Sequence, residues 1–168
     1  MARPATPGYA LGVRRLAILL ATTFGIGRLP IAPATWASAV TAVAVWLWLP
    51  PFAGLEMALI VLLLPIAVWS AQQAERVLGH DAHPIVIDEV VGQLIALLAV
   101  PREPGWLVAA FLLFRFFDIA KPLGIGALQR LPGGWGIVLD DVAAGIYSRL
   151  VLWAAVAWGP RVAAWLGM

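Results

Sequence analysis

Residues 85–100 read IVIDEVVGQLIALLAV, an apolar stretch that follows Pro84 and ends at Pro101. Its only charged residues, Asp88 and Glu89, lie next to each other near one end. Proline and glycine end helices, and they bound four further apolar segments in the same way, namely residues 36–49, 57–74, 105–121 and 140–158. This pattern predicts an all-α protein, a compact bundle of about five or six helices.

The composition predicts that this bundle is embedded in a membrane. Of the 168 residues, 62% are hydrophobic and 12% are charged, whereas a soluble domain has roughly half apolar and a quarter charged residues. Intrinsic disorder is excluded by the same numbers, and the net charge of +2 is too small for a nucleic-acid partner. Because the chain has no cysteine and only two histidines, thiolate chemistry and multi-histidine metal sites are excluded as well. Any metal site must therefore use Asp and Glu.

We expect residues 1–21 to form an N-terminal surface segment and residues 22–160 to form a single helical domain. The apolar segments are short for membrane spans, which need roughly 20 residues. If successive helices run in opposite directions, nearly all acidic residues fall at one end of the bundle. Most Arg and Lys residues fall at that same end, and the positive-inside rule then places it in the cytoplasm. A soluble but very apolar helical protein is the alternative.

The acidic residues at this end predict a metal site. Acids near a helix start are favoured by the helix dipole, which accounts for four of them but not for Asp118, which lies at a helix end. Clustered carboxylates repel one another unless a cation intervenes. Mg²⁺ prefers oxygen ligands and binds substrate phosphate alongside carboxylates. We therefore predict a Mg²⁺ site formed by Asp81, Asp88, Glu89, Asp118, Asp140 and Asp141.

Basic residues near these acids predict a phosphate-binding site. Arg115, Asp118 and Lys121 are spaced three residues apart, so they share one helix face; a surface ion-pair ladder is the alternative interpretation. The glycine- and proline-rich loop at residues 24–35 precedes the helix predicted at 36–49, whose free amides can hold phosphate. The predicted phosphate-binding residues are Arg28, Thr35 as the N-cap of that helix, Arg115 and Lys121.

Four stretches of the chain resemble the phosphatidylglycerophosphatase A family. They occur in order within residues 22–155, and they are residues 25–38, 85–92, 114–122 and 133–145. Two positions depart from the family pattern. Ala34 and Ala37 replace glycines, and the proline of an Asp-Pro motif has moved to Pro84, three residues after Asp81.

The resemblance implies a Mg²⁺-dependent phosphatase of the bacterial inner membrane, with its active site facing the cytoplasm. Its phospholipid substrate would be phosphatidylglycerophosphate, which loses its terminal phosphate to give phosphatidylglycerol. We expect Asp88, Asp118 and Asp141 to be catalytic, with Asp88 or Asp141 as general base. The alternatives are another lipid-phosphate enzyme (a phosphatidate phosphatase or a small lipid kinase), a component of a cation or proton transporter, and a non-catalytic assembly protein. The sequence does not define the oligomeric state.

Overall fold

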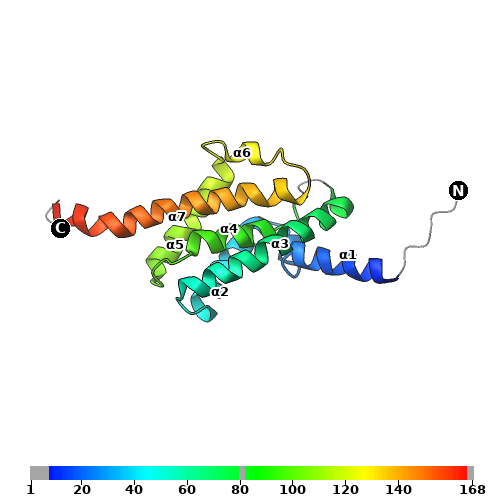
Figure 1. Cartoon of the computed structure of the whole chain (residues 1–168), viewed down its shortest axis with the longest axis horizontal. Helices are drawn as coiled ribbons and strands as arrows, with labels where there is room; N and C mark the ends of the chain where they lie inside the picture. Colours follow the sequence, from blue (N-terminus) through cyan, green and yellow to red (C-terminus); the bar gives the residue numbers. More distant parts are fainter. Residues whose placement is uncertain (1–7, 80–81, 166–168) are drawn as a thin grey trace.

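The computed structural model describes residues 8–79 and 82–165, and within these residues all regular secondary structure is helical. The predicted all-α class is therefore confirmed. In chain order the helices are α1 (Gly8–Ala21), a 3-10 turn η1 (Ile26–Arg28), α2 (Pro33–Trp48), α3 (Ala53–Leu78), α4 (Ile87–Leu97), α5 (Pro104–Ala120), the short α6 (Ile125–Leu128) and α7 (Gly134–Trp165). The five predicted segments correspond to α2, α3, α4, α5 and α7, and Figure 1 shows α1 and α7 extending from opposite ends of the bundle.

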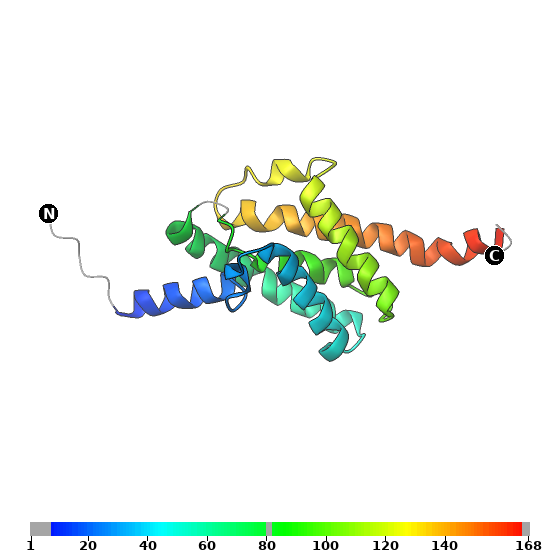
Figure 2. The ribbon, with the colours of Figure 1, turned by 180° about the vertical axis from the view of Figure 1, so that it is seen from behind.

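Helix α4 is the centre of the bundle. All of its residues except Val90 are buried, and α2, α3, α5 and α7 pack around it (Figures 1 and 2). Its contact with α7 is close because glycines face each other. A Cβ atom at Gly92 would meet the carbonyl oxygen of Asp141 at 2.7 Å, and one at Gly145 would meet the backbone of Gly92. Glycine thus lets the acidic start of α4 approach the acidic part of α7.

The helices alternate in direction, as the sequence predicted, and contacts between their ends confirm which ends lie together. At one end, the Val86 amide donates to the Ala21 carbonyl at 2.8 Å, and the Gly134 amide donates to Oε1 of Gln72 at 3.0 Å. At the opposite end, the Ala99 amide donates to Oε2 of Glu56 at 2.7 Å. We call the first the acidic end and the second the far end.

Three predicted helix starts are wrong. Helix α3 begins at Ala53, four residues before the predicted start. Helix α2 begins at Pro33, three residues before the predicted start, and its N-cap is Ala32 rather than Thr35. Proline is favoured in the first turn because its fixed φ suits the helix and its missing N–H is not needed there. Helix α7 begins at Gly134, six residues before the predicted start, so residues 134–136, whose glycines favour a turn, form its first turn.

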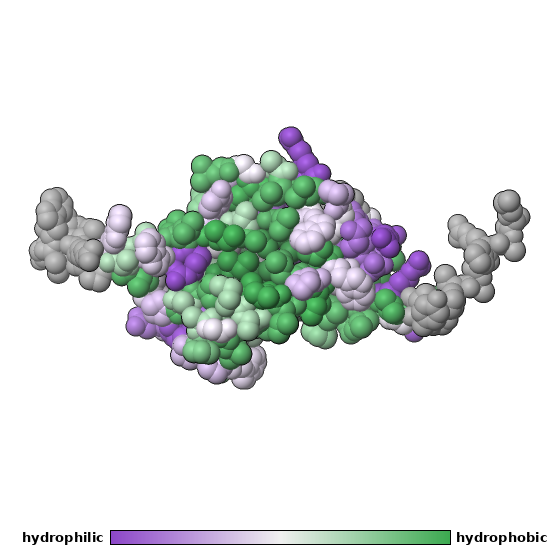
Figure 3. All heavy atoms as spheres, in the orientation of Figure 1, coloured by the Kyte–Doolittle hydropathy of each residue, from purple (hydrophilic) through white to green (hydrophobic). Residues whose placement is uncertain are grey.

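Only one helix within the described residues is long and apolar enough to cross a membrane by itself. This helix is α3, and most of its apolar stretch is exposed. Helix α4, with 11 residues, is only about 16 Å long at 1.5 Å per residue, roughly half the thickness of a hydrocarbon core. A hydrophobic surface covers the middle of the molecule, while hydrophilic residues gather toward the end at which α3 ends and α7 begins (Figure 3).

Candidate active site

A polar cavity of about 290 Å³ opens at the acidic end. It lies where the start of α2, the loop before α4, the start of α4, the end of α5 and the second turn of α7 meet. Its lining residues are Pro33, Ala34, Ala82, His83, Ile85, Asp88, Glu89, Asp118, Lys121, Gln129, Asp140 and Asp141. Five of these twelve residues are carboxylates, and all five are buried.

Three of the carboxylates form a tight group. Asp88, Glu89 and Asp141 each contribute one oxygen, and these three oxygens lie within 4.8 Å of one another. Burial raises the pKa of Asp88 well above its usual range, and the negative charges of Glu89 and Asp141 raise it further. Buried oxygens of all three side chains have no hydrogen-bond partner, namely Oδ1 of Asp88, Oε2 of Glu89 and Oδ2 of Asp141.

This group fits a divalent cation. Buried polar atoms are normally paired, and buried carboxylates left without partners are costly. A hard cation such as Mg²⁺ accepts oxygen ligands from carboxylates at one site, and it would neutralise the repulsion among Asp88, Glu89 and Asp141. The donor set contains oxygen alone, and within the described residues the three side chains come from two helices that are packed firmly together, α4 and α7.

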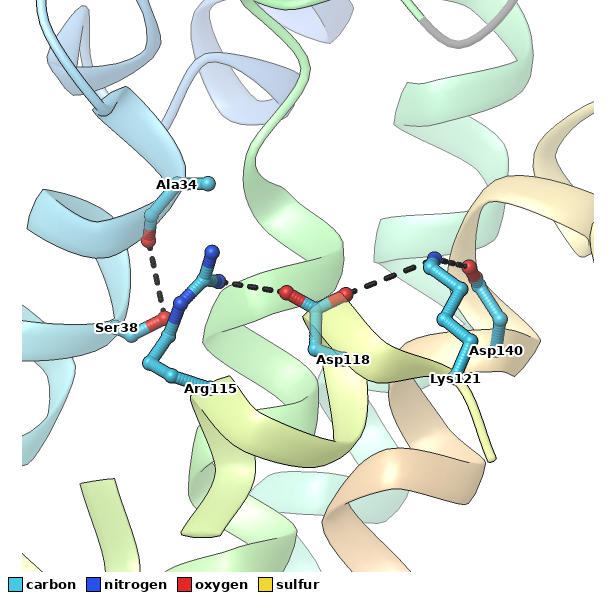
Figure 4. Close-up of polar contacts among 6 residues, drawn as sticks. All are labelled: Ala34, Ser38, Arg115, Asp118, Lys121 and Asp140. Carbon is cyan, nitrogen blue, oxygen red and sulfur yellow. Dashed lines mark hydrogen bonds and ion pairs between the residues drawn. The ribbon is translucent and has the colours of Figure 1, made fainter. Parts of the chain in front are cut away.

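A row of alternating charges borders the three acids (Figure 4). Oδ2 of Asp118 lies 2.8 Å from Nη1 of Arg115, and its Oδ1 lies 3.6 Å from Nζ of Lys121. Lys121 also donates a hydrogen bond to Oδ2 of Asp140. Burial alone would lower the pKa of Lys121, but the hydrogen bond and charge of Asp140 outweigh it and raise that pKa. Lys121 is therefore held in its charged form beside the carboxylates.

Local backbone geometry directs Lys121 into the site. Lys121 is the C-cap of α5 and has a left-handed conformation with φ of 43°. A residue with a Cβ atom pays about 1–2 kcal/mol for that conformation. The turn reverses the chain after α5, so that the side chain reaches both Asp118 on α5 and Asp140 on α7.

Because α7 starts earlier than predicted, helix capping does not explain its acidic residues. Asp140 and Asp141 are not at the start of a helix but lie almost two turns inside α7. The helix dipole acts mainly on the first turn, so capping does not account for these two residues. Asp88 and Glu89 do lie in the first turn of α4, but they are too deeply buried to be simple capping residues.

The structure brings together most of the predicted site residues. Of the predicted metal ligands, Asp88, Glu89, Asp118, Asp140 and Asp141 line the cavity, while Asp81 lies outside the described residues. Of the predicted phosphate-binding residues, Lys121 lines the cavity and Arg115 reaches it through Asp118. Arg28 is exposed at the end of η1 and Thr35 is half-buried in the first turn of α2. Neither lines the cavity.

Several residues near the site were missed by the sequence analysis. His83 and Gln129 line the cavity. Gln93 lies one turn beyond Glu89 on α4, is completely buried, and neither amide atom of its side chain has a hydrogen-bond partner. An isolated polar residue within the apolar run at 85–100 was the available signal for Gln93, whereas nothing in the sequence placed Gln129 beside the acids.

Comparison with known proteins identifies the family. The phosphatidylglycerophosphatase A family model matches residues 19–156. The chain is 43% identical over 146 residues to a Bacteroides thetaiotaomicron protein named "Putative phosphatidylinositol-3-phosphatase", covering 82% of this chain and 91% of the relative. Proteins named phosphatidylglycerophosphatase A from Haemophilus influenzae and Escherichia coli are 39% and 37% identical, over 83% and 80% of this chain and 88% and 80% of theirs.

No solved structure matches this chain. The family match covers the helices that surround the cavity, from the end of α1 to the middle of α7, and includes every described residue that lines it. The chain therefore belongs to the phosphatidylglycerophosphatase A family.

Proposed function

We propose that the protein is a Mg²⁺-dependent phosphatase that hydrolyses the terminal phosphomonoester of phosphatidylglycerophosphate and releases phosphatidylglycerol. The observation that carries this proposal is the excess of buried carboxylates at the acidic end. Five of them line one cavity with Lys121, and Arg115 is the only other cation paired with them within the described residues. Such an excess is unfavourable for the empty protein and favourable for a site that holds a cation together with a phosphate.

Each residue type has a definable role. Asp88, Glu89 and Asp141 would hold Mg²⁺, with Asp118, Asp140 and Asp81 as further candidate ligands, and the ion would neutralise phosphate charge and activate water. Arg115 and Lys121 would bind phosphate oxygens, as would Arg28 and the amides around Thr35 if the loop approaches the lipid headgroup. Asp88 or Asp141 would take the proton from the attacking water.

The proposed location is the cytoplasmic membrane of a bacterium, with the cavity facing the cytoplasm. Large apolar side chains are exposed along the bundle, for example Trp48, Leu62 and Leu112, which are 76%, 67% and 58% exposed. A surface of this kind marks contact with a membrane or with other apolar partners. The acidic end also carries exposed Arg28, Arg76 and Arg130, as the positive-inside rule requires of a cytoplasmic face.

The direct test is phosphate release by the purified protein from phosphatidylglycerophosphate, with Mg²⁺ or with EDTA. We expect release only with Mg²⁺. Phosphatidate and phosphatidylinositol 3-phosphate belong in the same assay, the second because of the name of the Bacteroides relative. Faster release from either of them would replace the proposed substrate. A requirement for ATP would indicate a lipid kinase, and no release from any lipid phosphate would overturn the enzymatic proposal.

Cysteine labelling tests the orientation, because the chain has no cysteine of its own. Gly27 and Gly134 are unsuitable positions, since a Cβ atom at either would collide with a backbone carbonyl. Exposed Arg28, His83 and Arg130 are better positions at the acidic end, with exposed Glu103 at the far end. In intact cells, we expect an impermeant thiol reagent to label the Glu103→Cys variant alone. Labelling of any of the other three would contradict the proposed orientation.

A further inference from the structure

An apolar groove of about 250 Å³ runs between α2 and α5, away from the acidic cavity. Ala39, Ala42, Val43 and Trp46 line it from α2, and Pro104, Leu107, Val108 and Phe111 line it from α5. Almost all of its lining surface is apolar, and within the described residues it contains no charged side chain. Ala39 and Trp46 are seven residues apart, so the groove extends about 10 Å along α2 at 1.5 Å per residue.

Arg115 and Ser38 mark the junction between the groove and the cavity, because they lie between the two along α5 and α2, although neither residue lines either space. On α5, Arg115 follows Phe111 by four residues, and on α2, Ser38 precedes Ala42 by four, so each polar residue lies one turn from a groove residue on the same helix side. Figure 4 shows the Arg115 side chain between Ser38 and Asp118. Because α2 and α5 run in opposite directions, the groove leads from this junction toward the far end.

We propose that this groove binds one acyl chain of the lipid phosphate whose headgroup occupies the acidic cavity. The proposal rests on the proposed function, because it takes the substrate to be a lipid. The charged phosphate would lie beside Arg115 and Lys121, and the chain would descend past Arg115 between the two helices. The groove is about 10 Å long. One leaflet is half of a hydrocarbon core of about 30 Å, so the groove would cover much of the depth of one leaflet.

A second groove on the opposite side of α2 provides a matched control. It has a volume of about 390 Å³ and is lined by residues that include Ala44, Trp48 and Leu63. None of its lining residues lines the acidic cavity. Ala39 and Ala44 are both half-buried on the same helix, and each lines only one of the two grooves. The same substitution at each position therefore fills one groove and leaves the other open.

The experiment compares Ala39→Trp with Ala44→Trp on three substrates, which are dipalmitoyl and dihexanoyl phosphatidylglycerophosphate and the soluble headgroup without acyl chains. Moving two or more methylene groups of the acyl chain out of apolar contact should lower kcat/KM about tenfold. We expect Ala39→Trp to lower kcat/KM at least tenfold for the dipalmitoyl lipid and less than twofold for the headgroup, while Ala44→Trp changes neither by more than twofold. Equal losses for all substrates, or for both variants, would overturn the proposal.

Two further measurements keep the test decisive if Ala39→Trp does not fold or if no turnover occurs. Trp46→Ala removes atoms at the distal end of the groove, so we expect the ratio of dipalmitoyl to dihexanoyl kcat/KM to rise severalfold. In addition, a lipid phosphate with a diazirine in its acyl chain can be cross-linked to wild-type protein in EDTA and mapped by mass spectrometry. Cross-links concentrated at residues 39–46 and 104–111 support the groove whatever the catalytic result. Cross-links spread evenly over the apolar surface would reject it.

Discussion

The two ends of the bundle treat buried charge in opposite ways. At the far end, Glu56 is the buried acid, and both of its oxygens are bonded, Oε1 to Arg102 and Oε2 to the Ala99 amide. At the acidic end, the cavity holds three more carboxylates than paired cations, and oxygens of four of these acids have no partner. A balanced cluster is what a fold needs to join two elements. An unbalanced cluster does not contribute to stability and must serve another function. Replacing an acid by its neutral amide should therefore stabilise the metal-free protein at the acidic end and destabilise it at the far end.

The largest effect is expected for Asp88→Asn. Removing one ligand and one negative charge should lower phosphatase activity by about a hundredfold to a thousandfold, because charge stabilisation of the transition state is lost. The same change should raise the Tm of the metal-free protein, because it removes a buried carboxylate that faces Glu89 and Asp141. Phosphate release and thermal unfolding in EDTA measure the two effects. Lower activity accompanied by lower metal-free Tm would show that Asp88 is a structural residue.

Asp118→Asn should lower activity, as Asp88→Asn does, but without raising the stability of the metal-free protein. Asp118 belongs to the cavity, but both of its oxygens are paired, with Arg115 and Lys121. We expect turnover to fall on the order of a hundredfold, with helical structure retained and with a loss of the Tm increase that Mg²⁺ produces. Unlike Asp88→Asn, this variant should not gain metal-free stability, because it leaves Arg115 without its partner and Lys121 with Asp140 alone. Near-normal activity would remove Asp118 from the catalytic site.

Glu56→Gln tests the balanced cluster. The amide leaves the charge of Arg102 buried without its counter-ion, and breaking a buried pair in this way costs about 3 kcal/mol. The side chains of Arg102 and Glu56 are only 15% and 5% exposed, so solvent screens the pair little. We expect a large fall in the free energy of unfolding, measured by denaturant titration in detergent, while kcat changes less than twofold. Glu103→Gln, at an exposed acid of the same end, is the control and should change neither.

The sequence predicted the charge cluster at the acidic end but not the ion pair at the far end. The alternation of five helices placed Asp88, Glu89, Asp118, Asp140 and Asp141 at one end, and the structure confirms that placement. The partnership of Glu56 with Arg102 was not predictable, because the two residues are 46 positions apart and nothing in their local sequence links them.

The starts of α2 and α7 were missed for a different reason. Sequence rules favour Thr35 as an N-cap and residues 133–136 as a turn. In the folded protein, Pro33 opens α2, and the Gly134 amide bonds to the Gln72 side chain of α3. Tertiary contacts thus extend α7 into a stretch that would favour a turn in isolation. Local propensity therefore gave the number and order of these helices better than it gave their ends.

The smallest expected effect, a shift of a few degrees in Tm, comes from pH. In the folded metal-free protein the pKa of Asp88 lies well above its usual range, mainly because of burial, whereas in the unfolded chain it is about 3.9. Between those two values the folded state binds more protons than the unfolded state, so stability falls as the pH rises from about 4 through the raised pKa.

Mg²⁺ competes with the proton on Asp88, so the apparent affinity for Mg²⁺ should rise over the same pH interval. We expect Tm in EDTA to fall from pH 5 to pH 8 and the increase in Tm caused by Mg²⁺ to grow over that range. Both trends should be weaker in Asp88→Asn, which loses one buried group with a raised pKa but keeps Glu89, Asp140 and Asp141, whose pKa values burial also raises. The Glu56→Gln variant should keep both trends, because the substituted residue lies at the far end, away from Asp88. Identical pH profiles for wild type and Asp88→Asn would show that Asp88 does not contribute to this pH dependence. A Tm of the wild type that does not change with pH in EDTA would mean that the acidic end is balanced, and the distinction between the two ends would fail.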